Sequence, residues 1–388
     1  MSALSAAQAS ARETGPTAHA MPAWIYNHPQ MTRLEMERIL KPSWQIACHV
    51  NSVPKAGDYV SFQIGPESVF VMRDRTGAIR GFHNICRHRG TRLLDGSGHC
   101  HGNIVCPYHG WSYRQDGALA GVADRDSFPG LDRSRLGLVP VRVDTAFGFV
   151  FVCLSGEPKP VGEVFAPLVE EFAPYRFLEM QPVGPISTAE WACDWKVAID
   201  NYLESYHVPI GHPGLQRMFT PDHKDQNGAP GVARGASWLR EQPSTRWSER
   251  LYQKMVGPLT THLPEPNRRC WRFYSLLPNL GIDVFPEQMD FFQILPSGPG
   301  RAITRSGVFA LPDQRREMRV LRALGQRINR QVNNEDKWLC ERVQQGLASS
   351  SYQPGPLSNI ERWMQEFHGL LRARIPETRL SAPPASFS

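Results

Sequence analysis

The chain has 388 residues, of which 41% are hydrophobic and 21% charged, a balance typical of folded globular proteins. At roughly 150 residues per domain, this length predicts two domains and a terminal segment. The 43 basic and 37 acidic residues give a formal charge of +6, too small an excess for a nucleic-acid binder. No apolar run reaches the roughly 18 residues of a membrane-spanning helix, so we expect neither nucleic acid nor membrane as a partner.

The N-terminal region combines a polar leader with a helical segment. Residues 1–20 are rich in Ala and Ser and lack the apolar core of a secretion signal, which predicts a disordered leader on a cytoplasmic protein. Residues 21–40 form the predicted helical segment, because apolar residues recur at helical spacing from Met31 until Pro42 ends the pattern.

Residues 41–155 are predicted to form a small all-β domain. Short apolar or alternating stretches are separated by turn residues, as in antiparallel hairpins, and lie at 57–64, 68–74, 79–85 and 147–154. Residues 156–162 are rich in Pro, Gly and polar side chains and read as a linker.

Residues 163–380 are predicted to form a larger α+β domain with an antiparallel sheet and helices. Helical periodicity at 195–207 is followed by strand-like stretches at 272–278, 290–296 and 303–312. A long helical pattern covers 313–347, and we expect it to break near Asn333 and Asn334. The last residues, 381–388, are predicted to be a disordered tail.

Two cysteines and two histidines in two short turns are the densest chemical signal. Cys86 and His88 form the first turn, Cys106 and His109 the second, with 17 residues between them. A structural zinc site usually takes a cysteine pair from one turn, whereas each turn here offers one thiolate and one imidazole. This mixture is typical of a Rieske [2Fe–2S] centre, with Cys86 and Cys106 on one iron and His88 and His109 on the other. The alternatives are a zinc site or unrelated buried residues.

Residues near these turns help to delimit the cluster site. Gly90 and Gly110 follow the two histidines, and we expect them to let the backbone approach the cluster closely. His99, Cys100 and His101 lie between the two turns, where we expect a connecting hairpin rather than further ligands. Eight cysteines are too few for a disulfide scaffold, so the remaining cysteines are expected to be bystanders.

A carboxylate and two histidines form the second candidate site. Asp200, Glu204 and His207 are spaced i, i+4 and i+7, which places them on one face of a predicted helix. A proline and a glycine after His207 end this helix and allow His212 to turn back toward His207. Two imidazoles and a carboxylate are the ligands of non-haem Fe(II) oxygenases, although a hydrogen-bonded structural His pair is the alternative.

Four stretches carry a family resemblance, namely CRH at 86–88, CPYHGW at 106–111, DNYLESYHVPIGH at 200–212 and EDKWLCERVQQGLASSSYQPG at 335–355. In these the chain resembles the α subunits of Rieske non-haem iron oxygenases over nearly its full length, and most closely the group that includes choline monooxygenase. The resemblance implies His207, His212 and Asp336 as iron ligands. Nothing in the residues themselves selects Asp336, and Glu335 is the fallback.

The resemblance also implies contacts between subunits. It places Glu204 between a cluster histidine of one subunit and the iron-bound histidine of the next, which implies a ring-like homotrimer. Many members that act on aromatic rings carry Asp at this position, so Glu204 favours the quaternary-ammonium group. Asp200 has either a supporting hydrogen bond or a structural role. Whether a β subunit is present stays open.

The implied function is that of a terminal oxygenase, which hydroxylates a small organic substrate with O2 and electrons that originate in NAD(P)H. A separate ferredoxin or flavin reductase would deliver these electrons, and Arg87, Arg89 and Arg92 are its candidate docking residues, or else solvated arginines. The first substrate hypothesis is hydroxylation or oxidative N-demethylation of a betaine, carnitine or choline type compound. The alternative is mono- or dioxygenation of an aromatic ring.

Aromatic residues in the later strands are candidate walls of a substrate pocket, because aromatic rings bind either a quaternary ammonium group or another ring. They are Trp271, Phe273, Tyr274, Phe285, Phe291 and Phe292. Ordinary strand packing is the alternative for each. A non-catalytic Rieske electron carrier is the alternative of a different class, but it needs only the first domain, and more than half of the chain follows the linker.

Overall fold

The computed structural model describes residues 18–221, 224–229 and 231–387, and the expected leader lies largely outside them. The chain divides into two compact units. The β unit comprises Leu40–Glu163, and the α+β unit comprises the residues up to Ile39 together with Val164–Ser388. None of the helices within the described ranges has the length and apolar content that crossing a bilayer demands.

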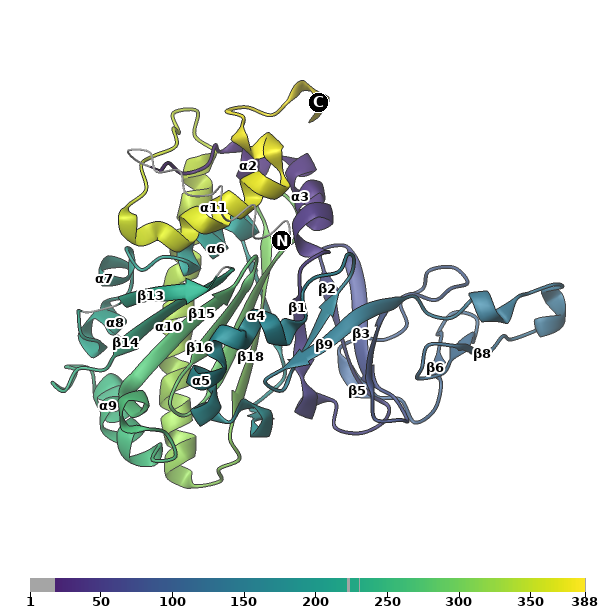
Figure 1. Ribbon diagram of the computed structural model, residues 1–388, viewed down its shortest axis with the longest axis horizontal. Coiled ribbons are helices and arrows are strands. Elements are labelled where there is room, and N and C mark those ends of the chain that lie inside the picture. The colour runs from purple at the N-terminus through teal and green to yellow at the C-terminus, as the bar shows by residue number, and fades with distance from the viewer. Residues whose placement is uncertain (1–17, 222–223, 230, 388) are drawn as a thin grey trace. The chain divides into compact units, whose positions relative to one another are not determined.

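The β unit is built on an antiparallel sheet, five of whose strands are labelled in Figure 1 as β1, β2, β3, β5 and β9. Among the described residues, its strand order is β1-β10-β9-β4-β3-β2-β5. Its strands are β1 (Gln45–His49), β2 (Asp58–Ile64), β3 (Glu67–Arg73), β4 (Ile79–His83), β5 (Ser97–His99), β9 (Pro140–Ala146) and β10 (Phe149–Cys153). A smaller sheet has the order β6 (Ile104–Val105), β7 (Ser112–Tyr113) and β8 (Leu119–Gly121). The hairpins expected from the apolar stretches are therefore present.

The core of the β unit connects the two sheets. Phe70 and Phe82 of the larger sheet belong to the same buried cluster as Cys86, Cys106 and Trp111. The sulfur atoms of the two candidate ligand turns thus lie on the inner side of those turns.

The part of the α+β unit that the structure describes contains an eight-stranded antiparallel sheet with the order β11-β18-β17-β16-β15-β14-β13, and β12 also pairs with β18. The strands are β11 (Gln181–Pro182), β12 (Ser187–Trp191), β13 (Lys224–Ala229), β14 (Val232–Trp238), β15 (Cys270–Leu276), β16 (Leu280–Val284), β17 (Met289–Pro296) and β18 (Ala302–Ala310). The described α-helices of this unit are α2 (Trp24–Asn27), α3 (Pro29–Glu35), α5 (Val169–Phe172), α6 (Trp195–Tyr202), α7 (Val208–Gly211), α8 (Pro213–Met218), α9 (Trp247–Leu259), α10 (Arg316–Leu347) and α11 (Arg362–Arg374). Helix α4 (Val161–Phe165) crosses the boundary between the two units along the chain.

Helices cover both faces of this sheet. On one face, Met318 and Leu321 of α10 and Tyr252 of α9 pack against Trp271 of β15 in one buried cluster. On the other face, Phe172 of α5 packs edge-on against Tyr274 of β15, with ring centroids 4.9 Å apart. Residues adjacent in a strand point to opposite faces. Phe273 therefore lies on the α10 side of the sheet, and Tyr274 lies on the α5 side.

Two expected helices differ from the observed ones. The helix predicted over 195–207 ends at Tyr202, because the Glu204 carboxylate accepts hydrogen bonds from the backbone N–H groups of Tyr206 and His207 and competes with helical bonding. The break expected near Asn333 is absent, and α10 is continuous. The free energy gained by burying the apolar face of α10, from Met318 to Leu347, is larger than the cost of the low helix propensity of two asparagines.

The C-terminal segment, expected to be disordered, is described as far as Phe387 and contains a short 3-10 helix at Ala385–Phe387. The ring of Phe387 contacts Trp24 and His28, with centroids 6.1 and 5.4 Å apart. These two aromatic contacts give the segment an apolar anchor on the N-terminal helices.

Candidate metal centres

Two turns of the same design position the cysteines and histidines of the β unit. In the first, the Cys86 N–H donates to the Thr91 carbonyl at 2.8 Å and the Gly90 N–H to the Cys86 carbonyl at 3.0 Å. In the second turn, Cys106 donates to Trp111 at 2.8 Å and Gly110 donates to Cys106 at 3.1 Å. Each turn thus closes around its cysteine.

The two glycines are required for the backbone conformation of their turns. Gly90 and Gly110 have φ values of 72° and 67°, in the left-handed region that residues with a Cβ rarely adopt. A Cβ at Gly90 would meet no described heavy atom within 4 Å, and one at Gly110 would lie 3.8 Å from Ala123. These distances concern protein atoms alone, so the expectation that the two glycines let the backbone approach a bound cluster stays a prediction.

The two cysteines and two histidines of these turns differ in burial. Cys86 and Cys106 are buried, whereas His88 and His109 are half-buried, with ring centroids 4.7 Å apart. The ring of His88 also stacks on Trp111, at 5.0 Å and an interplanar angle of 8°. This arrangement offers two sulfur ligands inside and two imidazoles toward the surface.

The pKa shifts of Cys106 and His109 suit metal binding. Burial raises the pKa of the Cys106 thiol, but hydrogen bonds from the backbone N–H groups of Tyr108 and His109 outweigh it and lower this pKa overall. Burial and the neighbouring charge of His88 lower the pKa of His109, which favours the neutral imidazole. Nδ1 of His88 is buried without a hydrogen-bond partner among the described residues. One cysteine and one histidine from each turn fit the ligand set of a Rieske [2Fe–2S] cluster.

Tyr113 is a further functional candidate that sequence reasoning missed. Its hydroxyl accepts the Arg87 N–H at 2.9 Å and lies 3.2 Å from Cys86 Sγ. Because the oxygen already accepts from Arg87, its own proton can point toward the sulfur. His99, expected in a connecting hairpin, lies instead in β5, which pairs with β2, and its Nδ1 is 2.8 Å from Asp58 Oδ1.

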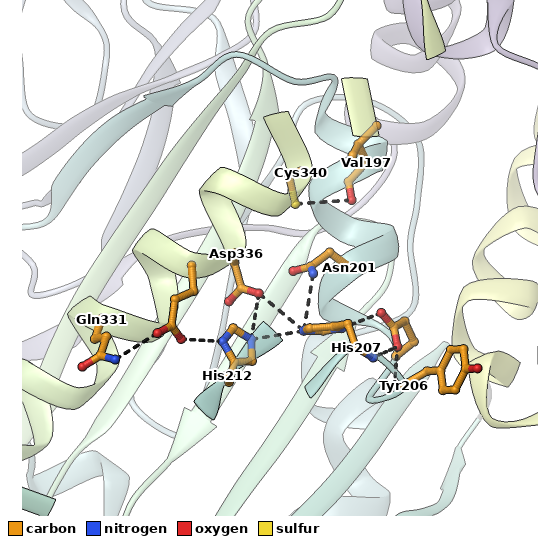
Figure 2. Close-up of polar contacts among 10 residues, drawn as sticks. Val197, Asn201, Tyr206, His207, His212, Gln331, Asp336 and Cys340 are labelled. Carbon is orange, nitrogen blue, oxygen red and sulfur yellow. Dashed lines mark hydrogen bonds and ion pairs between the residues drawn. The ribbon is translucent and has the colours of Figure 1, made fainter. Parts of the chain in front are cut away.

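The second centre brings together residues from three elements of the α+β unit (Figure 2). His207 precedes α7, His212 occupies the N-cap position of α8, and Asp336 lies within α10. Nε2 of His207 is 3.2 Å from Nε2 of His212. Asp336 Oδ1 is 3.4 Å from the first of these nitrogens and 3.0 Å from the second. One ligand atom from each residue lies within 4.8 Å of the others, so the three could hold one metal ion.

Two glutamates bind the outer nitrogens of these histidines. Glu204 Oε1 is 2.5 Å from His207 Nδ1, and Glu335 Oε2 is 2.8 Å from His212 Nδ1. Gln331 orients Glu335 by donating to its Oε1 at 2.9 Å. A carboxylate on Nδ1 holds the proton there and leaves the Nε2 lone pair free, as in many metal sites. Glu335 thus faces away from the point where Asp336 and the two Nε2 atoms converge.

This convergence fits a cation. When the protons are held on both Nδ1 atoms, the two Nε2 atoms and Asp336 Oδ1 offer only lone pairs to one another. Within the described ranges, Asp336 Oδ1 is buried without a hydrogen-bond donor. In the absence of an ion, burial lowers the pKa of His207 but Asp336 and Glu204 outweigh it and raise this pKa to about 9. The site therefore attracts positive charge, which a divalent metal would supply.

Asp200 has a structural role in this arrangement. Its carboxylate accepts a hydrogen bond from the Tyr26 hydroxyl at 2.8 Å and contacts His368 Nε2 at 2.9 Å. It thereby ties α6 to α2 and α11. The polar neighbour of His207 on α6 is instead Asn201, whose Nδ2 is 3.4 Å from Nε2.

A cavity of about 190 Å³ opens at this centre, lined by His207, His212 and Asp336 together with aromatic side chains. Of the aromatic residues expected to form its walls, Phe273 and Phe292 line it. Tyr274 touches it, but its hydroxyl donates to Glu171 at 2.7 Å on the opposite face of the sheet.

The other three expected wall residues do not line the cavity and are packed in the protein core. Trp271 and Phe285 belong to the cluster under α9 and α10, and Phe291 is fully buried. Sequence reasoning missed Asp283, Trp191 and Trp363, which do line the cavity. Strand pairing and helix docking decide these positions, and neither is visible in the sequence.

Family models match both units. The Rieske [2Fe-2S] domain matches residues 43–132, and the ring hydroxylating alpha subunit (catalytic domain) matches residues 180–377. The glycine betaine monooxygenase oxygenase subunit of Chromohalobacter salexigens is 30% identical over 88% of this chain and 82% of its own length. The chloroplastic choline monooxygenase of Spinacia oleracea is 29% identical over 92% of this chain and 79% of its own.

Solved structures share the fold. The quaternary ammonium Rieske monooxygenase CntA in complex with L-carnitine superimposes with a TM-score of 0.77 at 22% identity, covering 92% of this chain and 96% of that one. Naphthalene 1,2-dioxygenase from Rhodococcus sp. gives a TM-score of 0.73 at 22% identity, covering 97% and 98%. With the two family models and the curated relatives, these likenesses show that the chain belongs to the Rieske oxygenases with a ring-hydroxylating α-subunit catalytic domain, which use a Rieske [2Fe–2S] cluster and a mononuclear iron.

Proposed function

We propose that this protein is the terminal oxygenase of a system that oxidises a quaternary ammonium compound. In this proposal Cys86, His88, Cys106 and His109 hold the cluster, and His207, His212 and Asp336 hold the mononuclear Fe(II). The assignment of the iron site rests on one observation. Two histidine Nε2 atoms and one buried carboxylate oxygen converge beside an aromatic cavity.

The residues around the iron site have distinct tasks. An Fe(II) bound there would activate O2 with electrons that arrive through the Rieske cluster. Glu204 and Glu335 hold protons on the outer nitrogens of the two histidines and fix their orientation. The aromatic wall excludes water from the substrate and holds it beside the metal ligands. Glu335 is thus a positioning residue rather than a ligand.

The substrate class is supported by both the relatives and the cavity. The curated relatives act on glycine betaine and choline, and another, 31% identical over 50% of this chain, is the carnitine monooxygenase oxygenase subunit of Acinetobacter pittii. The cavity combines aromatic faces with carboxylates, a combination that attracts a cation. Hydroxylation at an N-methyl group, or at the carbon beside the nitrogen, would follow.

Electron transfer between subunits of a homotrimer is part of the proposal. A solved CntA structure is described in terms of inter-subunit electron transfer. Near the cluster turns, Val105 and Tyr108 are more than half exposed, and near Glu204 the same holds for Tyr206 and Ile210. Exposed apolar side chains beside both centres are consistent with a subunit interface. Glu204 would then connect His207 to a cluster histidine of the neighbouring subunit.

An external ferredoxin or flavin reductase would supply electrons from NAD(P)H. Arg92 pairs with Asp95 at 2.9 Å and is partly neutralised. Within the described part of the chain, Arg89 contacts the Tyr108 ring at 5.4 Å, and no ion pair engages Arg87. Arg87 and Arg89 are therefore the stronger candidates for docking an acidic partner. Neutralising both should reduce the reductase-dependent rate and its sensitivity to salt.

A substrate screen tests the proposed function. The protein, loaded with iron and supplied with a surrogate reductase, is given glycine betaine, carnitine, choline and proline betaine, with benzoate-type acids as the contrasting set. We expect O2 uptake coupled to product formation with a quaternary ammonium compound. Coupled turnover only with the aromatic acids would overturn the substrate class and leave the oxygenase assignment intact.

A further inference from the structure

Asp283 stands out as a carboxylate on the sheet floor of the cavity. It lies in β16 and lines the cavity, where the neighbouring residues of the same strand are buried in the core. The other lining carboxylates in the described ranges, Glu204 and Asp336, are each engaged with a histidine. Asp283 contacts no cationic side chain among the described residues. Its charge is therefore not used by the metal centre.

The fold fixes the direction of this carboxylate. Tyr202, in the last turn of α6, donates its hydroxyl to Asp283 Oδ1 at 2.7 Å. The ring of Tyr202 can approach the sheet only because residue 281 is a glycine, where a Cβ would lie 2.5 Å from that ring. Oδ2 has no hydrogen-bond partner within the described part of the chain. A hydrogen bond on one oxygen thus leaves the other available to a ligand.

Aromatic side chains surround this carboxylate. Phe273 is paired directly with Asp283 across β15 and β16, and Phe292 is paired with Gly281 across β16 and β17. Side chains of paired residues lie on the same face of a sheet. The ring of Phe292 also lies 5.8 Å from Tyr202 and 6.1 Å from Trp191. A carboxylate is thus set within an apolar, aromatic wall.

We infer that Asp283 is the counter-charge that holds the cationic head of the substrate against this wall and makes the pocket prefer a cation over a neutral molecule of the same shape. The inference rests on the proposed function and identifies the residue that makes the pocket select a positively charged substrate. An ionised carboxylate in an apolar setting is costly unless an opposite charge pairs with it. A quaternary ammonium group supplies that charge without needing a hydrogen-bond acceptor, and its methyl groups contact the rings.

Two pairs of ligands isolate the role of charge. Choline and 3,3-dimethylbutanol differ by nitrogen against carbon, and so do glycine betaine and 3,3-dimethylbutanoate. Dissociation constants are measured for the iron-loaded full-length protein without oxygen. We expect the wild type to bind the cationic member of at least one pair more tightly, by about tenfold or more. In Asp283→Asn this preference should fall to about twofold or less.

A matched control variant is available one strand away. Asp290 is paired with Asp283 across β16 and β17 but does not line the cavity, and Asn329 and Gln288 donate to its carboxylate. Asp290→Asn should therefore keep the cation preference. Cluster absorbance and iron content verify that each variant is folded. If Asp283→Asn does not fold, Tyr202→Phe is measured, which should weaken only the cationic ligand, by about threefold.

The outcomes separate the two hypotheses. A cation preference that persists in Asp283→Asn would overturn this inference and leave the substrate class standing. A wild-type protein that binds neither quaternary ammonium ligand would overturn the substrate class, and the role of Asp283 with it. Loss of the preference in Asp283→Asn but not in Asp290→Asn supports the inference.

Discussion

The two candidate centres are built by opposite strategies. The turns of the β unit place all four candidate ligands within residues 86–109, each turn closed by its own backbone hydrogen bonds. The candidate iron site takes two histidines from the segment after α6 and its carboxylate from α10, far along the chain. A centre made of local turns needs little beyond its own sequence to form, whereas the second depends on the packing of α6, α7 and α10.

The side chains around the candidate histidine ligands also differ between the two centres. Each histidine of the α+β unit has a glutamate on its outer nitrogen, and the cavity adds Asp283. In the β unit, His88 Nδ1 has no partner among the described residues and the adjoining side chain is Trp111. A carboxylate on the outer nitrogen makes the other ring nitrogen more basic, which favours binding of a divalent ion.

Removing the carboxylate of the candidate iron site should produce the largest difference between the two centres, with loss of the iron and retention of the cluster. Asp336→Ala is expected to abolish oxygenation and mononuclear iron binding, because two imidazoles alone remain at that point. The cluster spectrum should be retained, since its turns lie in the other unit. Glu335→Ala is the control, and should weaken iron binding by about 10- to 100-fold rather than abolish it. Iron analysis and visible absorbance measure both, and full iron retention in Asp336→Ala would contradict the assignment.

Replacing Glu204 tests the proposed link between the centres. Glu204→Gln keeps the shape but removes the charge from His207 Nδ1, so turnover should fall about 10- to 100-fold while both metal sites stay loaded. Rapid-mixing measurement of cluster oxidation distinguishes slow electron transfer from slow chemistry. Unchanged cluster oxidation would show that Glu204 acts only on the histidine.

The affinity for a cationic ligand should depend on pH through Asp283. Burial raises the pKa of Asp283 to about 7, with the Tyr202 hydrogen bond opposing it and the charge of Asp336 adding to it, and Asp290 faces it across the strands. The ionised form prevails above this pKa, so cation affinity should be present at higher pH and be lost as the pH falls below about 7. We expect a decrease of about tenfold from pH 8 to about pH 6. The neutral isostere, titrated in parallel, should show no such decrease.

The smallest expected effect concerns the cluster turns. Tyr113→Phe removes the hydroxyl beside Cys86 Sγ, and loss of a hydrogen bond to a cluster sulfur lowers the reduction potential. A shift of a few tens of millivolts corresponds to one such bond. Redox titration followed by EPR measures it. An unchanged potential would mean that the Tyr113 proton is directed elsewhere.

The sequence by itself determined what depends on local pattern. The spacing of Cys86, His88, Cys106 and His109 predicts a mixed sulfur and nitrogen site, because turns of this length bring their own residues together. Period-two alternation predicts the β unit. The two histidines after α6 indicate either a metal site or a structural histidine pair, and the family resemblance favours the metal site. The quaternary-ammonium hypothesis came from the family resemblance and from Glu204.

Only the tertiary structure decided which residues meet across long separations. Asp336 and Glu335 are adjacent in sequence, and the orientation of α10 alone turns the first toward both Nε2 atoms and the second toward an outer nitrogen. Strand register decides that Phe273 lines the cavity while Trp271 packs in the core. Asp283 could not be distinguished from any other strand aspartate. Its role depends on Gly281, which leaves room for the Tyr202 ring, and on the neighbouring rings of Phe273 and Phe292. These residues come together only because β15, β16 and β17 pair and α6 packs against them.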